Sequence, residues 1–177
     1  MSKIKRLKLK RKQFFIHYSF SVPVLFPAIL SLIDIIKIRT GTYDGMRTVN
    51  EQIETSLPFL VVGLLLIIRQ YWRLHFREIK MNYTEKDLQH ALGKTSMELK
   101  WRVEKNRDGF FRAYRVGGDG PWWWGEMITI ISDDNTILIN SISDPNQTPT
   151  PSSFGQDRKN VETFIKNLET IVTENKE

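Results

Sequence analysis

The chain has 177 residues, 41% of them hydrophobic, with 26 Lys and Arg against 20 Asp and Glu, three His and no Cys. The lack of cysteine excludes disulfide frameworks, thiolate nucleophiles and cysteine-ligated metal centres. Residues 1–12 carry seven positive charges and no negative one, whereas residues 81–177 carry twelve positive and fifteen negative charges. A nucleic-acid-binding domain needs clustered Lys and Arg on its folded part, so nucleic acid is not predicted as a partner.

Residues 14–36 form an apolar run of 23 residues with one formal charge, Asp34. As a helix, this run is long enough to cross the ~30 Å hydrocarbon core of a bilayer. A cleaved signal peptide would have a shorter apolar region ending at small residues, whereas Ile-Ile-Lys-Ile-Arg follows here. Pro23 and Pro27 each remove a backbone donor. The run therefore predicts a kinked, uncleaved transmembrane helix.

A second apolar run, residues 57–68, has only twelve residues. Its flanks extend it to residues 53–72, because Arg69 can snorkel and Tyr71 and Trp72 suit the headgroup boundary. The alternative is a buried helix of a soluble core, which the presence of the first apolar run disfavours. We therefore predict a hairpin of two transmembrane helices within residues 13–80.

Positive charges flank both predicted spans. Seven precede the first span in residues 1–12, four lie at or after the end of the second, and the loop of residues 37–52 carries three. Cytoplasmic loops are enriched in Lys and Arg, so both termini are predicted to be cytoplasmic, in the plasma (inner) membrane, with the loop external.

Several side chains are predicted to anchor the chain at the membrane surface. For Asp34, pairing with Lys37 or Arg39 at the interface is favoured over a role in an ion path. Arginines recur every four residues after the second span, which predicts that its helix continues into the headgroups as a juxtamembrane helix and favours anionic lipid. The predicted anchoring residues are Asp34, Arg69, Tyr71, Trp72, Arg73 and Arg77.

Residues 81–177 are predicted to form a cytoplasmic α+β domain, because apolar runs shorten and turn signals appear there. Thr84 is a good N-cap, with Asp87 at the third helical position, for a helix over residues 85–94. Alternating apolar and charged residues from Met97 to Glu104 predict the first strand.

Three more strands and a helix complete the predicted domain. The strands span residues 110–116, 124–132 and 136–143, and the helix, capped near Asp157, runs towards the C-terminus. The order α-β-β-β-β-α predicts an antiparallel four-stranded sheet covered on one face by helices.

No constellation of catalytic residues is evident. His17, His75 and His90 lack metal-ligand spacing, and there is no Gly-x-Ser-x-Gly motif, so no metal, cofactor or catalytic residue is predicted. An enzyme acting on a membrane-proximal substrate remains an alternative. A cleft that collected Arg112, Arg115, Glu126 and His90 would support it.

Three consecutive tryptophans, Trp122, Trp123 and Trp124, are the most unusual feature of the sequence. Consecutive side chains of a strand point to opposite faces, so at least one tryptophan is expected to be exposed. With Arg112 and Arg115 they form the candidate interaction surface, for a protein or for lipid. The alternative is that the tryptophans pack under the C-terminal helix and that the arginines are simply solvated.

Three segments in the C-terminal part of the chain carry a resemblance to known proteins. They are Trp124-Gly-Glu-Met-Ile-Thr-Ile130, Ile137-Leu-Ile-Asn-Ser141 with Asp144-Pro145, and Arg158-Lys-Asn-Val161 leading to Phe164. By these segments the chain resembles a group of small, uncharacterised bacterial membrane-anchored proteins with a C-terminal α+β domain. Phe154-Gly-Gln-Asp157 stands where the group has Trp-Gly-Lys-Asn. The resemblance implies no activity and therefore no catalytic residues.

Together these patterns predict a membrane-anchored, non-enzymatic binding or regulatory module. Its partners would be membrane lipid and a protein at the cytoplasmic face. The alternative is a subunit of a membrane assembly that works through its transmembrane hairpin, using Asp34, Gly63 or the proline face. The sequence does not predict an oligomeric state.

Overall fold

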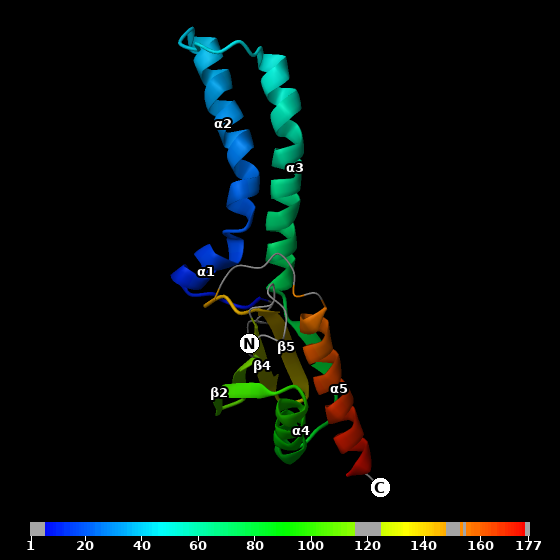
Figure 1. The fold of residues 1–177 in the computed structure, drawn as a ribbon. Helices are drawn as coiled ribbons and strands as arrows, with labels where there is room; N and C mark the ends of the chain where they lie inside the picture. The colour runs from blue at the N-terminus through cyan, green and yellow to red at the C-terminus, as the bar shows by residue number, and fades with distance from the viewer. Residues whose placement is uncertain (1–5, 116–124, 148–152, 154, 176–177) are drawn as a thin grey trace.

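Two long helices stand above an α+β domain in the computed structural model, which describes residues 6–115, 125–147, 153 and 155–175 (Figure 1). α2 (Ser21–Thr40) and α3 (Val49–Arg73) form a hairpin, and both are long and apolar enough to cross a membrane. α3 begins at a capping box in which the hydroxyl of Thr48 accepts from the backbone N–H of Glu51.

The first apolar run is not one continuous helix. It divides into α1 (Arg11–Tyr18), which lies at an angle at the foot of the hairpin, and α2 (Figure 1). Pro23 accounts for the break, because proline has no N–H to donate to the carbonyl of Ser19 and its ring would clash with that carbonyl in a continuous helix. The helix therefore begins at Ser21 and runs to Thr40, later than the predicted span of residues 14–36.

Small and polar side chains join α2 to α3. A Cβ atom added to Gly63 would lie 2.3 Å from Cδ2 of Leu25, so the glycine lets the two helices approach closely. Gln52 accepts from the Ser31 hydroxyl at 3.0 Å and donates to the Asp34 carboxylate at 3.2 Å. Asp34 therefore pairs across the hairpin. No ion pair with Lys37 or Arg39, the predicted partners, is found among the described residues.

The domain contains a five-stranded antiparallel sheet in the order β1-β5-β4-β3-β2. The strands are β1 (Arg77–Lys80), β2 (Trp101–Arg107), β3 (Phe110–Arg115), β4 (Glu126–Asp133) and β5 (Thr136–Ser143). The mixed α+β class is confirmed, with one strand more than the predicted four.

The extra strand replaces the predicted juxtamembrane helix. α3 ends at Arg73, and Arg77 begins β1, which pairs with β5. The arginines at every fourth position predict a continued helix instead. The four residues of β1 include three charged side chains, so they lack the alternation of apolar and polar residues by which a short edge strand is recognised. The folded domain therefore begins before the predicted boundary at residue 81.

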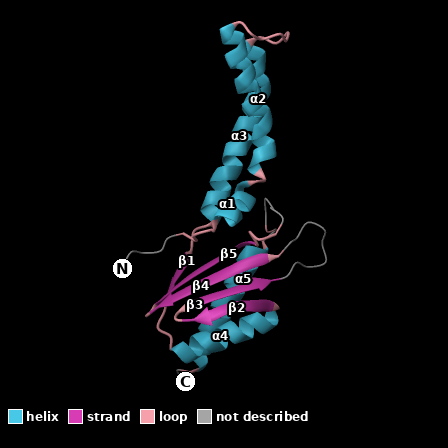
Figure 2. Ribbon diagram, turned by 90° about the vertical axis from the view of Figure 1, so that its left-hand side faces the viewer, coloured by secondary structure: helices cyan, strands magenta, loops and turns pink. Residues whose placement is uncertain are grey.

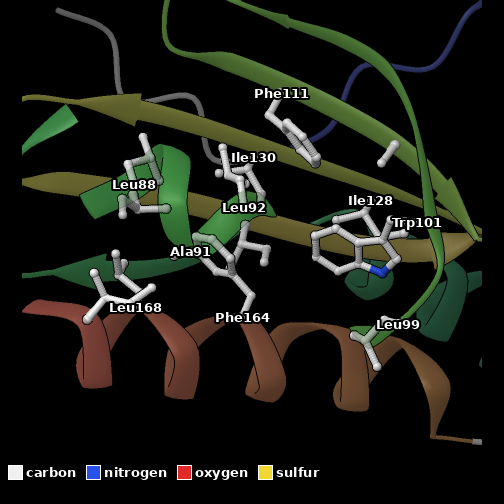
Figure 3. Close-up of a cluster of buried hydrophobic side chains, with 14 of the residues drawn as sticks. Leu88, Ala91, Leu92, Leu99, Trp101, Phe111, Ile128, Ile130, Phe164 and Leu168 are labelled. Atoms are coloured by element: carbon white, nitrogen blue, oxygen red, sulfur yellow. The ribbon is translucent and has the colours of Figure 1, made fainter. Parts of the chain in front are cut away.

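α4 (Glu85–Glu98) and α5 (Gln156–Glu174) cover one face of the sheet (Figure 2). The Thr84–Asp87 capping box of α4 is present as predicted. Figure 3 shows Leu92 of α4 and Phe164 of α5 packed in one cluster with Ile128 and Ile130 of the sheet. Burial of this cluster is the main stabilising contribution to the domain.

α4 is one turn longer than predicted, and β2 starts correspondingly later. Thr95 is buried and accepts from the side-chain amide of Asn167 on α5 at 3.1 Å. Packing on α5 thus keeps residues 95–98 helical, although Met97 to Glu104 alternate as in a strand. The change to β2 follows at Lys100, which has a positive φ of 55°.

Replacing Gly63 with leucine is expected to force α2 and α3 apart. We expect Gly63→Leu to destabilise the full chain in detergent by ~1–3 kcal/mol, as overpacking of a close contact does. Thermal unfolding of the purified protein measures this effect, and adding Leu25→Ala should restore part of the loss.

Gly93→Ala is the matched control. Gly93 lies within α4, and a Cβ atom there would meet no atom within 4 Å, so the change should stabilise the protein by ~0.5–1 kcal/mol. An unchanged unfolding midpoint for Gly63→Leu would show that the close contact does not hold the hairpin together.

Candidate functional site

The helical hairpin and the domain meet at a short joint, residues 74–76. The side-chain amide of Asn140 on β5 donates to the carbonyl oxygens of Arg73 and His75, both at 2.8 Å. On the other side of the joint, the backbone N–H of Leu7 donates to the carbonyl of Leu74 at 2.8 Å. The backbone of the joint is therefore held by hydrogen bonds from both the sheet and the N-terminal segment.

An apolar cluster fills the space between the joint and the sheet face that α4 and α5 leave open. Its buried members are Leu7, Leu74, Met127 and Ile142, with Leu9, Phe76 and Tyr114 packed around them. The N-terminal segment, the joint and the three strands β3, β4 and β5 all contribute to it. The domain is thus packed against the foot of the hairpin and does not hang from a flexible linker.

A pocket of about 260 Å³, which we call the junction pocket, opens beside this joint. It lies between the end of α3, the edge of the sheet and the first turn of α5. The residues that line it are Trp72, Arg73, His75, Arg77, Ile139, Asn140, Ser141, Asp157, Arg158 and Val161. Three arginines and one carboxylate line the junction pocket, and Glu162, outside the lining, pairs with Arg158. The arginines still outnumber these two carboxylates, so the junction pocket carries excess positive charge.

Arg73 is the most buried arginine of the junction pocket. Its side chain is only 10% exposed, and it donates to the Ser143 hydroxyl at 3.1 Å. The Asp157 carboxylate lies 3.8 Å away, which is too far for a direct hydrogen bond. Arg158, on the rim, pairs with Glu162 at 2.6 Å, where both side chains are well exposed. Asp157 therefore compensates the charge of Arg73 only in part.

Behind the junction pocket lies a buried polar cluster centred on Asn160 of α5. Its side-chain amide donates to the Glu126 carboxyl and, at 3.0 Å, to the Ser141 hydroxyl. Its side-chain oxygen accepts from the indole N–H of Trp101 at 3.1 Å. One residue of α5 thus joins strands β2, β4 and β5.

Glu126 is fully buried, and its Oε1 has no hydrogen-bond partner among the described residues. Burial raises the pKa of this carboxyl to about 8, although the Asn160 hydrogen bond and the nearby Arg115 and Arg73 act in the opposite direction. Glu126 is therefore mostly neutral at pH 7.

The structure separates the residues proposed from the sequence as a polar site. Arg115 pairs with Glu126 across the strands and donates to the Gln156 side chain at 2.8 Å. Arg112 belongs to the opposite face, where it lines a groove of about 650 Å³ together with Lys10, Tyr114 and Asp144. Trp122, Trp123 and Trp124 lie outside the described residues, so their predicted role as an interaction surface remains a prediction.

His90 is far from the other members of the postulated catalytic cleft. It is exposed on α4, one turn after Asp87, which accepts from Asn175 at the C-terminal end of α5. Glu126 contacts Asn160 near the other end of that helix, about 22 Å away at 1.5 Å per residue. The cleft that would have supported an enzyme is therefore not formed by these residues.

The cluster around Asn160 was not predicted from the sequence, although one signal for it was present. Asn160 precedes Phe164, Leu168 and Ile171 on the apolar face of α5. A polar side chain in that position is buried and needs partners. Among the described residues, no group of three His, Cys, Asp or Glu is arranged to hold a metal ion.

Glu126→Gln is expected to change how stability depends on pH. The raised pKa means that the folded chain keeps a proton that the unfolded chain releases above about pH 4.5. The stabilising contribution of the neutral carboxyl is therefore complete below that pH and is lost as the pH rises through about 8. The loss should be on the order of a few kcal/mol in the wild type and absent in the variant.

Urea unfolding of the full chain in detergent between pH 5 and 9 measures this difference. Glu104→Gln, on the exposed part of β2, is the charge-matched control and should follow the wild-type profile. Parallel profiles for Glu126→Gln and the wild type would contradict the assignment of a neutral, buried carboxyl.

No protein-family model matches the chain, and no curated protein or solved structure is significantly similar to it. The resemblance of residues 124–164 to small bacterial membrane-anchored proteins therefore stays a prediction.

Proposed function

We propose that the chain is a two-span membrane protein that holds a non-enzymatic α+β binding module against the cytoplasmic membrane surface. The observation that carries this proposal is the joint of residues 74–76, which Asn140 and the apolar cluster pack onto the sheet. A domain fixed in this way presents the same end to the membrane at all times. That end carries the junction pocket and the groove at Arg112.

The exposed surfaces of α2 and α3 support insertion into a bilayer. Only 11% of the most apolar window of each helix is buried inside the protein. A core helix of a soluble protein would be mostly covered, whereas here leucines and isoleucines project outward along both helices. Such exposed apolar surfaces are suited to the hydrocarbon core of a bilayer.

α1 fits the membrane interface. Phe14 and Phe15 are 51% and 72% exposed, and Arg11 and Lys12 precede them. A short helix with exposed aromatic rings and a basic N-terminus suits the boundary between headgroups and acyl chains. The basic N-terminal segment and the arginines at the end of α3 favour the cytoplasmic side for both termini.

The alternative function, a subunit of a membrane assembly that works through its hairpin, is less well supported. Asp34 and Gly63, which were candidates for contacts with other membrane proteins, are engaged within the hairpin by Gln52 and Leu25. The apolar outer faces of α2 and α3 remain available for such contacts.

The topology is tested by fusing a compartment-sensitive reporter after Glu177 and a second one in the loop near Gly45. We expect the tail to report a cytoplasmic location and the loop an external one. Extraction with carbonate should leave the chain in the membrane fraction, and detergent should release it. Release by carbonate, or an external tail, would refute the proposal.

Docking of the domain is tested by Asn140→Ala, which removes both hydrogen bonds to the joint. Amide hydrogen exchange of residues 74–80 should accelerate, and the protein should lose ~1–3 kcal/mol of stability. Asn106→Ala is the matched control, because Asn106 bonds only the exposed Gln89 side chain at 2.7 Å among the described residues. Unchanged exchange in Asn140→Ala would mean that the joint is held by other contacts.

A further inference from the structure

We propose that the junction pocket binds the phosphate of an anionic phospholipid whose acyl chains lie along α3. This inference rests on the proposed function, because it needs the hairpin to be in a bilayer. It adds a defined ligand class and a defined site, formed by Arg73, Arg77 and Arg158.

The charge of the junction pocket favours an anion. Arg73 is nearly buried, and Asp157, the single carboxylate of the lining, does not bond it directly. The guanidinium of Arg77 forms no ion pair with any described carboxylate. Arginine guanidinium groups donate two parallel hydrogen bonds to phosphate oxygens, so an entering phosphate would compensate the excess charge directly.

The surroundings of the pocket add to this preference. Asp157 and Arg158 belong to the first turn of α5, a helix of 19 residues whose N-terminal end bears partial positive charge. Glu126 lies behind the pocket, and because burial raises its pKa to about 8, it contributes little negative charge at pH 7.

The position of the pocket favours a lipid over a soluble phosphate. Trp72, on its rim, is 66% exposed, and Tyr71 beside it is 41% exposed. Directly above them α3 presents Leu65 and Ile68, which are 60% and 51% exposed. Figure 1 shows the start of α5 just below this end of α3. A headgroup in the pocket would leave its acyl chains against this apolar surface.

Net charge should then decide which lipid binds. Phosphatidylcholine carries an ammonium group that cancels its phosphate, whereas phosphatidylglycerol keeps a net negative charge. Asp157 lies beside Arg73 and Glu162 pairs with Arg158, so the three arginines still exceed the nearby carboxylates and should select the anionic lipid. The volume of about 260 Å³ leaves room for a phosphate with a small substituent, so a glycerol headgroup fits.

The experiment uses the purified full chain in a neutral detergent and titrates it with dioctanoyl phosphatidylglycerol, dioctanoyl phosphatidylcholine and inorganic phosphate. Native mass spectrometry reports the bound ligand. We expect phosphatidylglycerol to bind at least tenfold more tightly than phosphatidylcholine. Inorganic phosphate that bound as tightly as phosphatidylglycerol would overturn the lipid as the source of the phosphate.

Two sets of variants locate the site. Arg77→Gln with Arg158→Gln should weaken phosphatidylglycerol binding at least tenfold, whereas the control, Lys94→Gln with Lys166→Gln, removes the same charge from exposed positions on α4 and α5 and should stay within twofold. Asp157→Asn removes the carboxylate of the pocket and should tighten binding several-fold. An equal loss in both double variants, or no effect of Asp157→Asn, would overturn the proposed site.

Failure of this inference is distinguishable from failure of the proposed function. If the chain remains in carbonate-washed membranes with the expected topology but does not distinguish phosphatidylglycerol from phosphatidylcholine, only the lipid site is refuted. If carbonate releases the chain, the membrane anchor itself is refuted, and with it the premise of the lipid site.

Discussion

The two hydrogen bonds that Asn140 donates to the carbonyl oxygens of Arg73 and His75 determine how the protein is arranged. The last carbonyl groups of a helix have no partner within the helix and must be satisfied elsewhere. Here the central part of β5 satisfies one of them, and only three residues separate the end of α3 from the start of β1. The direction of the hairpin and the direction of the sheet are therefore linked by the chain itself.

This link also creates the junction pocket. Arg73 is the last residue of α3 and Arg77 the first of β1, so the joint fixes where their backbones lie relative to the start of α5. A longer, flexible connection would let the two arginines move independently of Arg158. Cations whose backbones are held in place lose less conformational entropy on binding a phosphate, so a docked domain suits the proposed lipid binding better than a tethered one.

The buried polar cluster around Asn160 determines how α5 packs on the sheet. Burying Glu126 costs free energy, and the cost is limited because the carboxyl stays neutral and accepts from Asn160. The amide of Asn160 simultaneously bonds Ser141, and its oxygen bonds Trp101. Such a network accepts only one register of α5 on the sheet, because a shift of one residue would leave several buried groups without partners.

Most elements of the domain could be predicted from the sequence, because local patterns determine them. The Thr84–Asp87 capping box, the strand over residues 136–143 and the apolar face of α5 each depend on neighbouring residues in the chain. The two apolar runs likewise follow from composition. The predicted length of α4 was too short. Its last turn is kept helical by the hydrogen bond that Asn167 donates to Thr95, and these two residues are 72 positions apart in the chain.

Composition and short-range periodicity are sufficient to predict the two apolar helices, the α+β class and the excess of positive charge that flanks the helices. The fold shows in addition that Arg77 belongs to a strand, that Arg112 and Arg115 face opposite sides of the sheet, and that Asn160 bonds Glu126. Those relations depend on strand pairing and helix packing between residues far apart in the chain. A single sequence contains no local signal for such contacts.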